Sequence, residues 1–308
     1  MRYLLPLLLF ASQAMADTHV WWGNFGGSVG DWSVASNWAG DAAAVPAAGD
    51  HVFIPEGSAA ISAGLDQSSV ALGNVVIEPG YTGAIGTYAS TDSDPNWLIL
   101  DCDSLTTSGT GMIFVKLSHP SGNIDVNVIS ADTTPTYTGE YGLYLATDGG
   151  GGGIDDLSVK AGYVAVNGFG ADLALTVTQL RSLTTSAVVL IGQDATLTNA
   201  DCYGGSTTIN STNTTADLEV YGGSCYVRSS GAVTAAVVEG GTLYLEGTGT
   251  ITTLTQNGGI VDATPTGLNR TITTVNHNSG TLHRDSETTT ITTYNLPTVN
   301  ATTTQSKK

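Results

Sequence analysis

The stretch from Tyr203 to Arg284 repeats one short pattern, and this repeat constrains the fold more than any other feature of the chain. It reads YGGSTTI, YGGSCYV, EGGTLYL, NGGIVDA and NSGTLHR in turn. The corner glycines are Gly205, Gly223, Gly241, Gly259 and Gly280, spaced by 18, 18, 18 and 21 residues. The second and fourth positions after each glycine are mostly apolar, as in a strand with one buried face. Such a period indicates units that stack on one another.

Aligning these units predicts which side chains face inward. The residues expected to point into the core after each corner are Val164/Val166, Val188/Leu190, Thr207/Ile209, Cys225/Val227, Leu243/Leu245, Val261/Ala263 and Leu282/Arg284. A second alternation precedes each corner, and a third apolar site, such as Val233 or Ile251, completes the circuit. We interpret His277 and Arg284, which occupy inward positions in the last coil, as the end of the core.

This alignment predicts an all-β, single-stranded parallel β-helix, or β-solenoid, with three strands and 18–24 residues per coil. Parallel crossovers are overwhelmingly right-handed, so we expect a right-handed solenoid. The left-handed hexapeptide helix also uses 18 residues per coil, but the sequence has no regular six-residue repeat of apolar residues and glycine that would support this fold. Stacking at about 4.8 Å per coil would make roughly 14 coils about 65 Å long.

The chain divides into five expected segments. They are a signal peptide (1–16), a Trp-rich N-terminal cap (17–50), irregular coils with longer loops (51–156), regular coils (157–296) and a polar tail (297–308).

The first residues indicate export. Arg2 precedes the apolar run Leu4 to Phe10, and Ala14-Met15-Ala16 provides small residues for cleavage after Ala16. Asp17 would then be the new N-terminus. No later segment has 18 continuous apolar residues, so we expect no transmembrane segment and a secreted or cell-surface location.

Four of the five tryptophans lie in the expected cap, at Trp21, Trp22, Trp32 and Trp38. The end of a solenoid exposes strand edges that need a cover, and a Trp-rich segment can provide one. The spacing of Asn37, Trp38, Pro46, Gly49 and Asp50 before HVFI resembles the opening of exported bacterial β-solenoid proteins. Sugar binding by the tryptophans is the alternative interpretation.

The repeats VVEGGTLYLEGTGTITTLTQNGGIVDA are similar to the GG-T-L repeats of self-associating autotransporter passenger domains, over about residues 195–290. This resemblance implies an exported right-handed β-helix that can self-associate. We expect no C-terminal translocator barrel in this chain, and in this respect it departs from those proteins.

The charge of the chain narrows the range of expected partners. The formal net charge is −18, with only nine Lys and Arg residues, and these are scattered. Nucleic acid is therefore disfavoured as a partner, because phosphate binding requires clustered basic residues.

The cysteines Cys102, Cys202 and Cys225 are too few for a disulfide scaffold. Buried thiols and a Cys202–Cys225 bridge both remain open.

Two sets of residues are candidate sites. Tyr203, Tyr221, Tyr226 and Tyr244 are predicted to point outward on neighbouring coils, where they could bind a glycan or another chain, or only stabilise the sheet surface.

Asp201 and Glu219 are predicted to share a register, and like charges side by side favour a bound cation such as Ca²⁺. Asp155 follows a glycine run that matches one calcium nonapeptide, GGGGIDDL. Solvated surface charge is the alternative for all three acids. Lys, Arg and His residues in the sequence show no placement that would complete a catalytic set with Asp201 and Glu219.

We therefore expect an exported structural or adhesive protein that binds a glycan, a surface protein or another copy. The alternatives are a polysaccharide-active lyase or hydrolase on the same fold, and a viral or phage attachment component, which the signal peptide disfavours. A groove with three or more carboxylates and one Arg or Lys would favour the enzyme.

Overall fold

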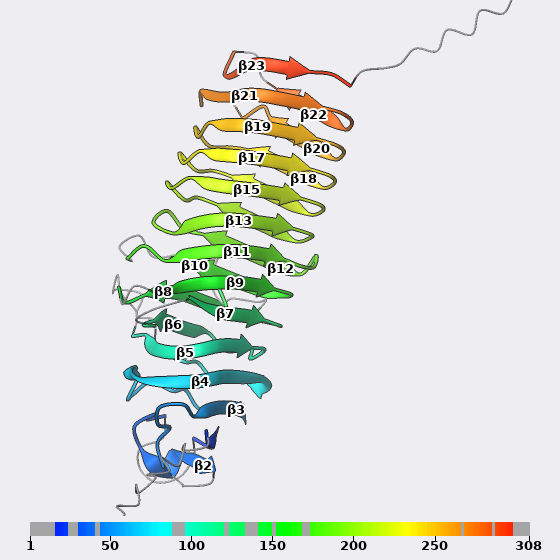
Figure 1. Ribbon diagram of the computed structural model, residues 1–308. Helices are drawn as coiled ribbons and strands as arrows, with labels where there is room; N and C mark the ends of the chain where they lie inside the picture. Colours follow the sequence, from blue (N-terminus) through cyan, green and yellow to red (C-terminus); the bar gives the residue numbers. More distant parts are fainter. Residues whose placement is uncertain are drawn as a thin grey trace, which may run out of the picture.

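The computed structural model describes residues 16–23, 30–40, 44–87, 96–119, 123–132, 141–149, 152–167, 173–265, 268–284 and 287–297. Nearly all of the expected signal peptide and of the polar tail lies outside these ranges. The described chain is all β, apart from one short 3₁₀ turn at Ala35–Asn37. Its strands stack in parallel into a β-solenoid of about 10 turns, with about 21 residues per coil (Figure 1). The predicted fold class is confirmed.

Most coils consist of two strands, which form two parallel stacks. The first stack contains β5 (Leu98–Thr107), β7 (Asn123–Val128), β9 (Gly153–Val159), β11 (Thr176–Ser182), β13 (Thr196–Cys202), β15 (Thr215–Val220), β17 (Val233–Val238), β19 (Ile251–Gln256), β21 (Arg270–His277) and β23 (Thr289–Asn295).

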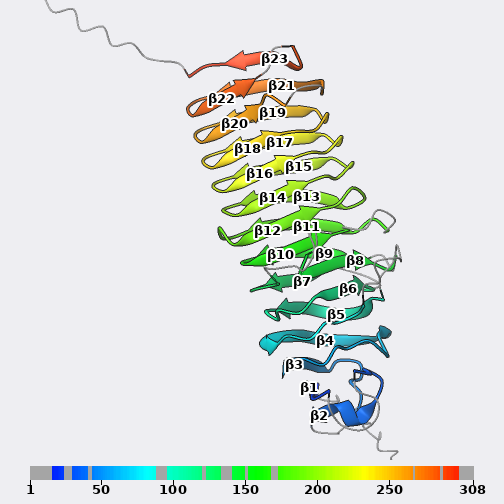
Figure 2. The same ribbon diagram turned by 180° about the vertical axis from the view of Figure 1, so that it is seen from behind.

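The second stack, seen from behind in Figure 2, contains β6 (Ile113–Leu117), β8 (Leu143–Thr147), β10 (Gly162–Val166), β12 (Ala187–Ile191), β14 (Ser206–Ile209), β16 (Ser224–Val227), β18 (Thr242–Leu245), β20 (Ile260–Ala263) and β22 (Thr281–Arg284). Before these come β1 (Thr18–Trp21), β2 (Trp38–Gly40), β3 (His51–Gly57) and β4 (Asp66–Tyr81). Strand β1 pairs antiparallel with β2 and parallel with β3.

Two details of the predicted coil were wrong. The third apolar site is not a separate strand, because Val233 and Ile251 open the longer strands β17 and β19. In β17 the buried residues are Val233, Ala236 and Val238, so the chain bends inside one strand instead of ending it. The estimate of 14 coils was also too high, because the N-terminal coils are longer than the 18-residue repeat.

The glycine corners work through a left-handed backbone conformation. Gly223 has φ of +67°, and a Cβ built there would lie 2.5 Å from the carbonyl oxygen of Gly205 in the coil before. Any other residue would meet both steric strain and this contact. The corner glycines therefore stack directly on one another and allow the tight coil.

One predicted register was wrong, in the coil without a glycine corner. The structure pairs Val189 with Thr207 and Ile191 with Ile209, so Val188 and Leu190 point outward. Ser182 pairs with Cys202 before the turn, and Val188 pairs with Ser206 after it. The chain from Ser182 to Val188 is two residues longer than the chain from Cys202 to Ser206, so the turn between β11 and β12 is two residues longer than the turn between β13 and β14. A wider turn replaces the positive-φ glycine.

The main hydrophobic core runs through the described coils, from Trp21 in the cap to Val275 in β21, and a smaller second cluster contains Trp97, Phe114, Tyr144, Ala146 and Ala165. The three cysteines are buried free thiols, so the structure shows no Cys202–Cys225 bridge among its described residues. Burial raises the pKa of Cys102 to about 12, which keeps this thiol protonated and unreactive.

Three tryptophans close the N-terminal end of the core. Trp21, Trp32 and Trp38 are buried, and the ring centroids of Trp32 and Trp38 lie 4.7 Å apart. The indole N–H of Trp38 donates to the carbonyl of Trp32 at 2.7 Å. Only Trp22 of the four is exposed, so these rings do not form an exposed sugar-binding platform.

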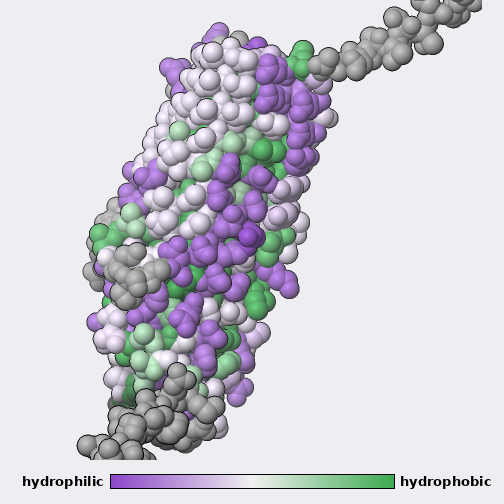
Figure 3. Space-filling model, viewed as in Figure 1, coloured by the Kyte–Doolittle hydropathy of each residue, from purple (hydrophilic) through white to green (hydrophobic). Residues whose placement is uncertain are grey.

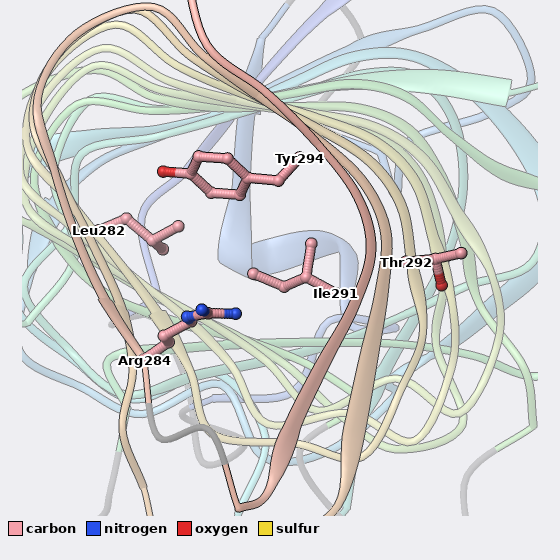
Figure 4. A pocket seen from close by; sticks show the side chains of 5 residues that line it. All are labelled: Leu282, Arg284, Ile291, Thr292 and Tyr294. Atoms are coloured by element: carbon pink, nitrogen blue, oxygen red, sulfur yellow. The ribbon is translucent and has the colours of Figure 1, made fainter.

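The last coil leaves a hollow of about 240 Å³ at the other end. Figure 4 shows Ile291 and Tyr294 pointing into it from one side of the coil, and Leu282 and Arg284 from the other. His277 Nδ1 lies 2.5 Å from the hydroxyl of Tyr294. Arg284 is exposed here, which agrees with its interpretation as the end of the core.

Within the described ranges, the fold contains no helix with the length and apolar character needed to cross a bilayer.

Candidate tyrosine face and charged row

The four predicted tyrosines form two stacked pairs, one on each side of the glycine corners. Tyr203 and Tyr221 follow β13 and β15, with ring centroids 4.8 Å apart and planes within 4°. Tyr226 and Tyr244 are paired directly across β16 and β18, at 4.6 Å and 6°. The coil spacing sets these distances, because equivalent residues on adjacent coils stack at the strand separation.

The first pair is the more exposed of the two. Tyr203 is 46% exposed and Tyr221 is 40% exposed. The hydroxyl of Tyr221 donates to the carboxylate of Glu219, two residues earlier. This hydrogen bond raises the pKa of Tyr221 to about 12, so the phenol stays neutral over the whole physiological range.

The second pair lies beside an open polar hollow of about 370 Å³. The guanidinium carbon of Arg228 lies 5.2 Å from the ring centroid of Tyr226, and Arg228 Nε donates to Glu246 Oε2 at 2.6 Å. The hollow is lined by Arg228 and Glu246 together with Gln193, Asn210, Thr212, Ser230, Gly247, Thr248 and Leu268. These residues follow the ends of successive strands of the second stack, so one ligand could touch several coils.

A row of charged side chains crosses the first stack from β9 to β15. The carboxylate of Asp156 accepts a hydrogen bond from Arg181, and Arg181 Nε lies 3.9 Å from Asp201 Oδ2. Arg181 pairs with Asp201, and Asp201 pairs with Glu219, in the strand register. Figure 3 shows this part of the face as largely hydrophilic, next to a paler area over β17 to β21.

The sequence alignment placed no Lys, Arg or His residue where it could complete a catalytic set with Asp201 and Glu219, whereas the structure places Arg181 beside Asp201. Arg181 was missed because the longer turn after β11 hides its alignment with Asp201. Partial burial raises the pKa of Asp201, and Glu219 adds to this effect, while Arg181 and Gln179 oppose it. The guanidinium therefore already supplies positive charge between Asp156 and Asp201.

The three acids predicted to bind a metal do not converge. Asp201 and Glu219 are neighbours, whereas Asp155 is exposed on β9, where its neighbour Asp156 makes the contact with Arg181. Two glycines of the proposed calcium loop, Gly150 and Gly151, lie outside the described residues. Calcium binding stays a prediction.

A cluster near the N-terminus was not predicted from the sequence. Among the described residues, one group of three His, Cys, Asp or Glu side chains has its ligand atoms within 4.8 Å of one another: Asp17, His19 and Asp50. His19 Nε2 lies 3.0 Å from Asp50 Oδ2. The alternation of β1 signals that His19 faces inward, but only the pairing of β1 with β3 brings it to Asp50.

The chain matches no protein-family model, no curated protein and no solved structure. Function therefore has to be argued from the two sites alone.

Proposed function

We propose that this protein is exported and binds a glycan through the tyrosine face of its second stack. The observation that carries the proposal is the parallel, stacked pair of Tyr226 and Tyr244 beside the hollow that contains Arg228 and Glu246. Sugar rings present apolar faces that pack on aromatic rings, and hydroxyl groups that pair with amide, carboxylate and guanidinium groups. The hollow offers all three polar types, in Asn210, Glu246 and Arg228.

The size and repetition of this face favour a chain-like ligand. A volume of about 370 Å³ is within the range of small-molecule sites, although the hollow is open to solvent. Stacked coils place equivalent groups about 4.8 Å apart, so a polysaccharide lying along the axis would meet a repeated surface. The expected signal peptide and the resemblance to passenger domains of self-associating autotransporters support a role at a cell surface.

Glycan-array binding tests this proposal. The double variant Tyr226→Ala/Tyr244→Ala should lose binding by at least about tenfold, which corresponds to about 1.4 kcal/mol. Tyr203→Ala/Tyr221→Ala removes the other stacked pair and serves as the matched control, with binding close to that of the unmodified protein. Equal binding by the first variant and the unmodified protein would contradict the proposal.

The resemblance to self-associating passenger domains makes another surface protein, or a second copy, the alternative ligand of the same face. Sedimentation of the purified protein over a range of concentrations distinguishes these cases. Association that the Tyr226→Ala/Tyr244→Ala variant abolishes, without glycan binding, would favour a protein partner.

A polysaccharide-active enzyme is the second candidate, because the row of Asp156, Arg181, Asp201 and Glu219 joins three carboxylates to one arginine. Paired carboxylates across a bound sugar are what glycoside hydrolysis requires. The row lies on the first stack, however, and lines neither the hollow beside Tyr226 nor the one at the C-terminal end. Cleavage of a polyuronate that is lost in Asp201→Ala would favour the enzyme over the binding protein.

A further inference from the structure

The carboxylate of Asp50 collects three donors where the cap meets the first coil. Asp50 is 8% exposed. Its Oδ2 accepts from the backbone N–H of Ala47 at 2.8 Å and lies 3.0 Å from His19 Nε2. Its Oδ1 lies 3.1 Å from the backbone nitrogen of Asp17. A buried carboxylate needs such partners, and a positively charged one stabilises it most.

The nitrogen of Asp17 has a particular chemistry in this chain. While Ala16 is attached, this atom is a neutral peptide N–H. Hydrolysis of the Ala16–Asp17 peptide bond consumes one water, leaves a carboxylate on Ala16 and makes the nitrogen of Asp17 a primary amine, which is protonated at neutral pH. The bond to Asp50 would then change from a neutral hydrogen bond to an ion pair.

We propose that the α-ammonium group created at Asp17 by signal removal docks onto Asp50 and locks the N-terminal cap. Removal of the signal peptide then strengthens a contact that already holds the cap. This inference rests on the proposed export signal and does not depend on the proposed glycan site.

The surroundings of Asp17 favour this assignment. The carbonyl of Asp17 accepts from the backbone N–H of His51 at 2.9 Å, and Thr18 pairs with His51 at the start of β3. Strand β1 then continues to Trp21, which packs in the buried tryptophan group of the cap. A charge fixed at Asp17 would therefore hold the strand that covers the end of the core.

A metal ion is the competing occupant, since Asp17, His19 and Asp50 offer ligand atoms close together. Asp50, however, already accepts from Ala47 through one oxygen and from Asp17 through the other. The chain's own ammonium would reach the same carboxylate without displacing either bond. It would also offset part of the negative charge of the two aspartates.

The test compares two secreted or proteolytically released forms of the protein. One begins at Asp17, and the other retains Ala16, which leaves the Asp17 N–H in place but moves the positive charge one residue away. Urea unfolding is monitored by tryptophan fluorescence. The equilibrium constant of unfolding should be at least about tenfold smaller for the form that begins at Asp17 than for the form that retains Ala16. In an Asp50→Asn background the two forms should be equal. Terminal sequencing of the secreted protein should begin at Asp17.

Three results would overturn the proposal: equal stability of the two forms with Asp50 intact, a secreted protein that begins elsewhere, or a stabilisation that EDTA removes from both forms alike. If Asp50→Asn does not fold, the α-amine of the Asp17 form is titrated with an acylating reagent. Protection relative to the form that retains Ala16 supports the docked ammonium, and equal reactivity contradicts it.

Discussion

The N-terminal coils (β3 to β9) and the C-terminal coils (β11 to β23) build the same solenoid by different local means. From β13 onward, most turns into the second stack are short and built on a positive-φ glycine, such as Gly223. In the N-terminal coils the strands have uneven lengths, with 16 residues in β4 and five in β6, and β4 shifts register between Gln67 and Ala71. In line with the second stack, the coils before β6 form only isolated bridges, at Ile61 and Ile85.

The comparison shows that the core, and not the turn, defines the coil. Ile61 and Ile85 are fully buried although neither belongs to a strand, and they stack on Ile113 in β6. The inward apolar residue of each coil meets the one before it, whatever the length of the loop between them. Longer loops are tolerated because the entropic cost of closing a loop grows only slowly with its length.

The largest effect should come from the core and should be the same in both regions. Leu105 in β5 and Leu243 in β18 are both fully buried. We expect Leu105→Ala and Leu243→Ala each to lower the free energy of unfolding by about 2–5 kcal/mol. Denaturant titration measures this loss.

Exposed residues of the first stack, one in each region, provide the controls, and Asn127→Ala on β7 and Thr252→Ala on β19 should each change stability by less than about 0.5 kcal/mol. A much smaller loss for Leu105→Ala than for Leu243→Ala would mean that the N-terminal coils do not share the continuous core.

Substitutions at the corners should affect stability differently in coils with a glycine corner and in the coil without one. Gly223→Ala places a Cβ on a left-handed backbone against a carbonyl oxygen, so we expect a loss of at least about 1–2 kcal/mol. Ser186→Ala alters the corner that lacks a glycine and should change stability by less than about 0.5 kcal/mol. Denaturant titration measures both losses of stability. Comparable losses for the two variants would show that the glycine conformation does not determine the tight corner.

The charged row crosses the boundary between the two regions, because Arg181 on β11 joins Asp156 on β9 to Asp201 on β13. Arg181→Gln should lower stability at neutral pH by no more than about 1 kcal/mol, since the pair is partly exposed. Arg228→Gln breaks the more exposed pair with Glu246 and should have a smaller effect. Thermal unfolding at low and high salt checks both, and an effect that persists unchanged in high salt would contradict an electrostatic role.

The smallest effect is a dependence on pH. The pKa of Asp201 is raised in the folded protein, so the folded state holds this proton more tightly than the unfolded state. Its contribution to stability is therefore present below the ordinary value of 3.8 and is lost as the pH rises through the raised pKa. Asp201→Asn should remove this acid-range slope, and an unchanged slope in a stability–pH profile would assign it to another group.

Much of this architecture could be predicted from the residues alone, because period and alternation are properties of the chain. The 18-residue repeat was enough to predict the parallel stack and the inward positions of Cys225 and Leu243. The same alignment failed at Val188 and Leu190, since a turn without glycine can take extra residues and nothing local marks how many.

The sites were harder to predict for the same reason. The stacking of Tyr226 on Tyr244 follows from the repeat, but Arg181 lies beyond an irregular turn and so escaped the alignment. The contact between His19 and Asp50 depends on how β1 pairs with β3, which no period in the sequence describes. Long-range pairing without a repeat has no simple signature in one sequence.

The most direct test is a distance measurement along one column of the first stack. Asp125, Asp217 and Thr293 are exposed and lie in the same register column, on β7, β15 and β23. Four coil steps separate each neighbouring pair, or about 19 Å at about 4.8 Å per step. Spin labels at Asp125→Cys/Asp217→Cys and at Asp217→Cys/Thr293→Cys should give nearly equal, narrow distances by electron–electron double resonance. A longer or broad distance for the first pair alone would contradict a single register through both regions.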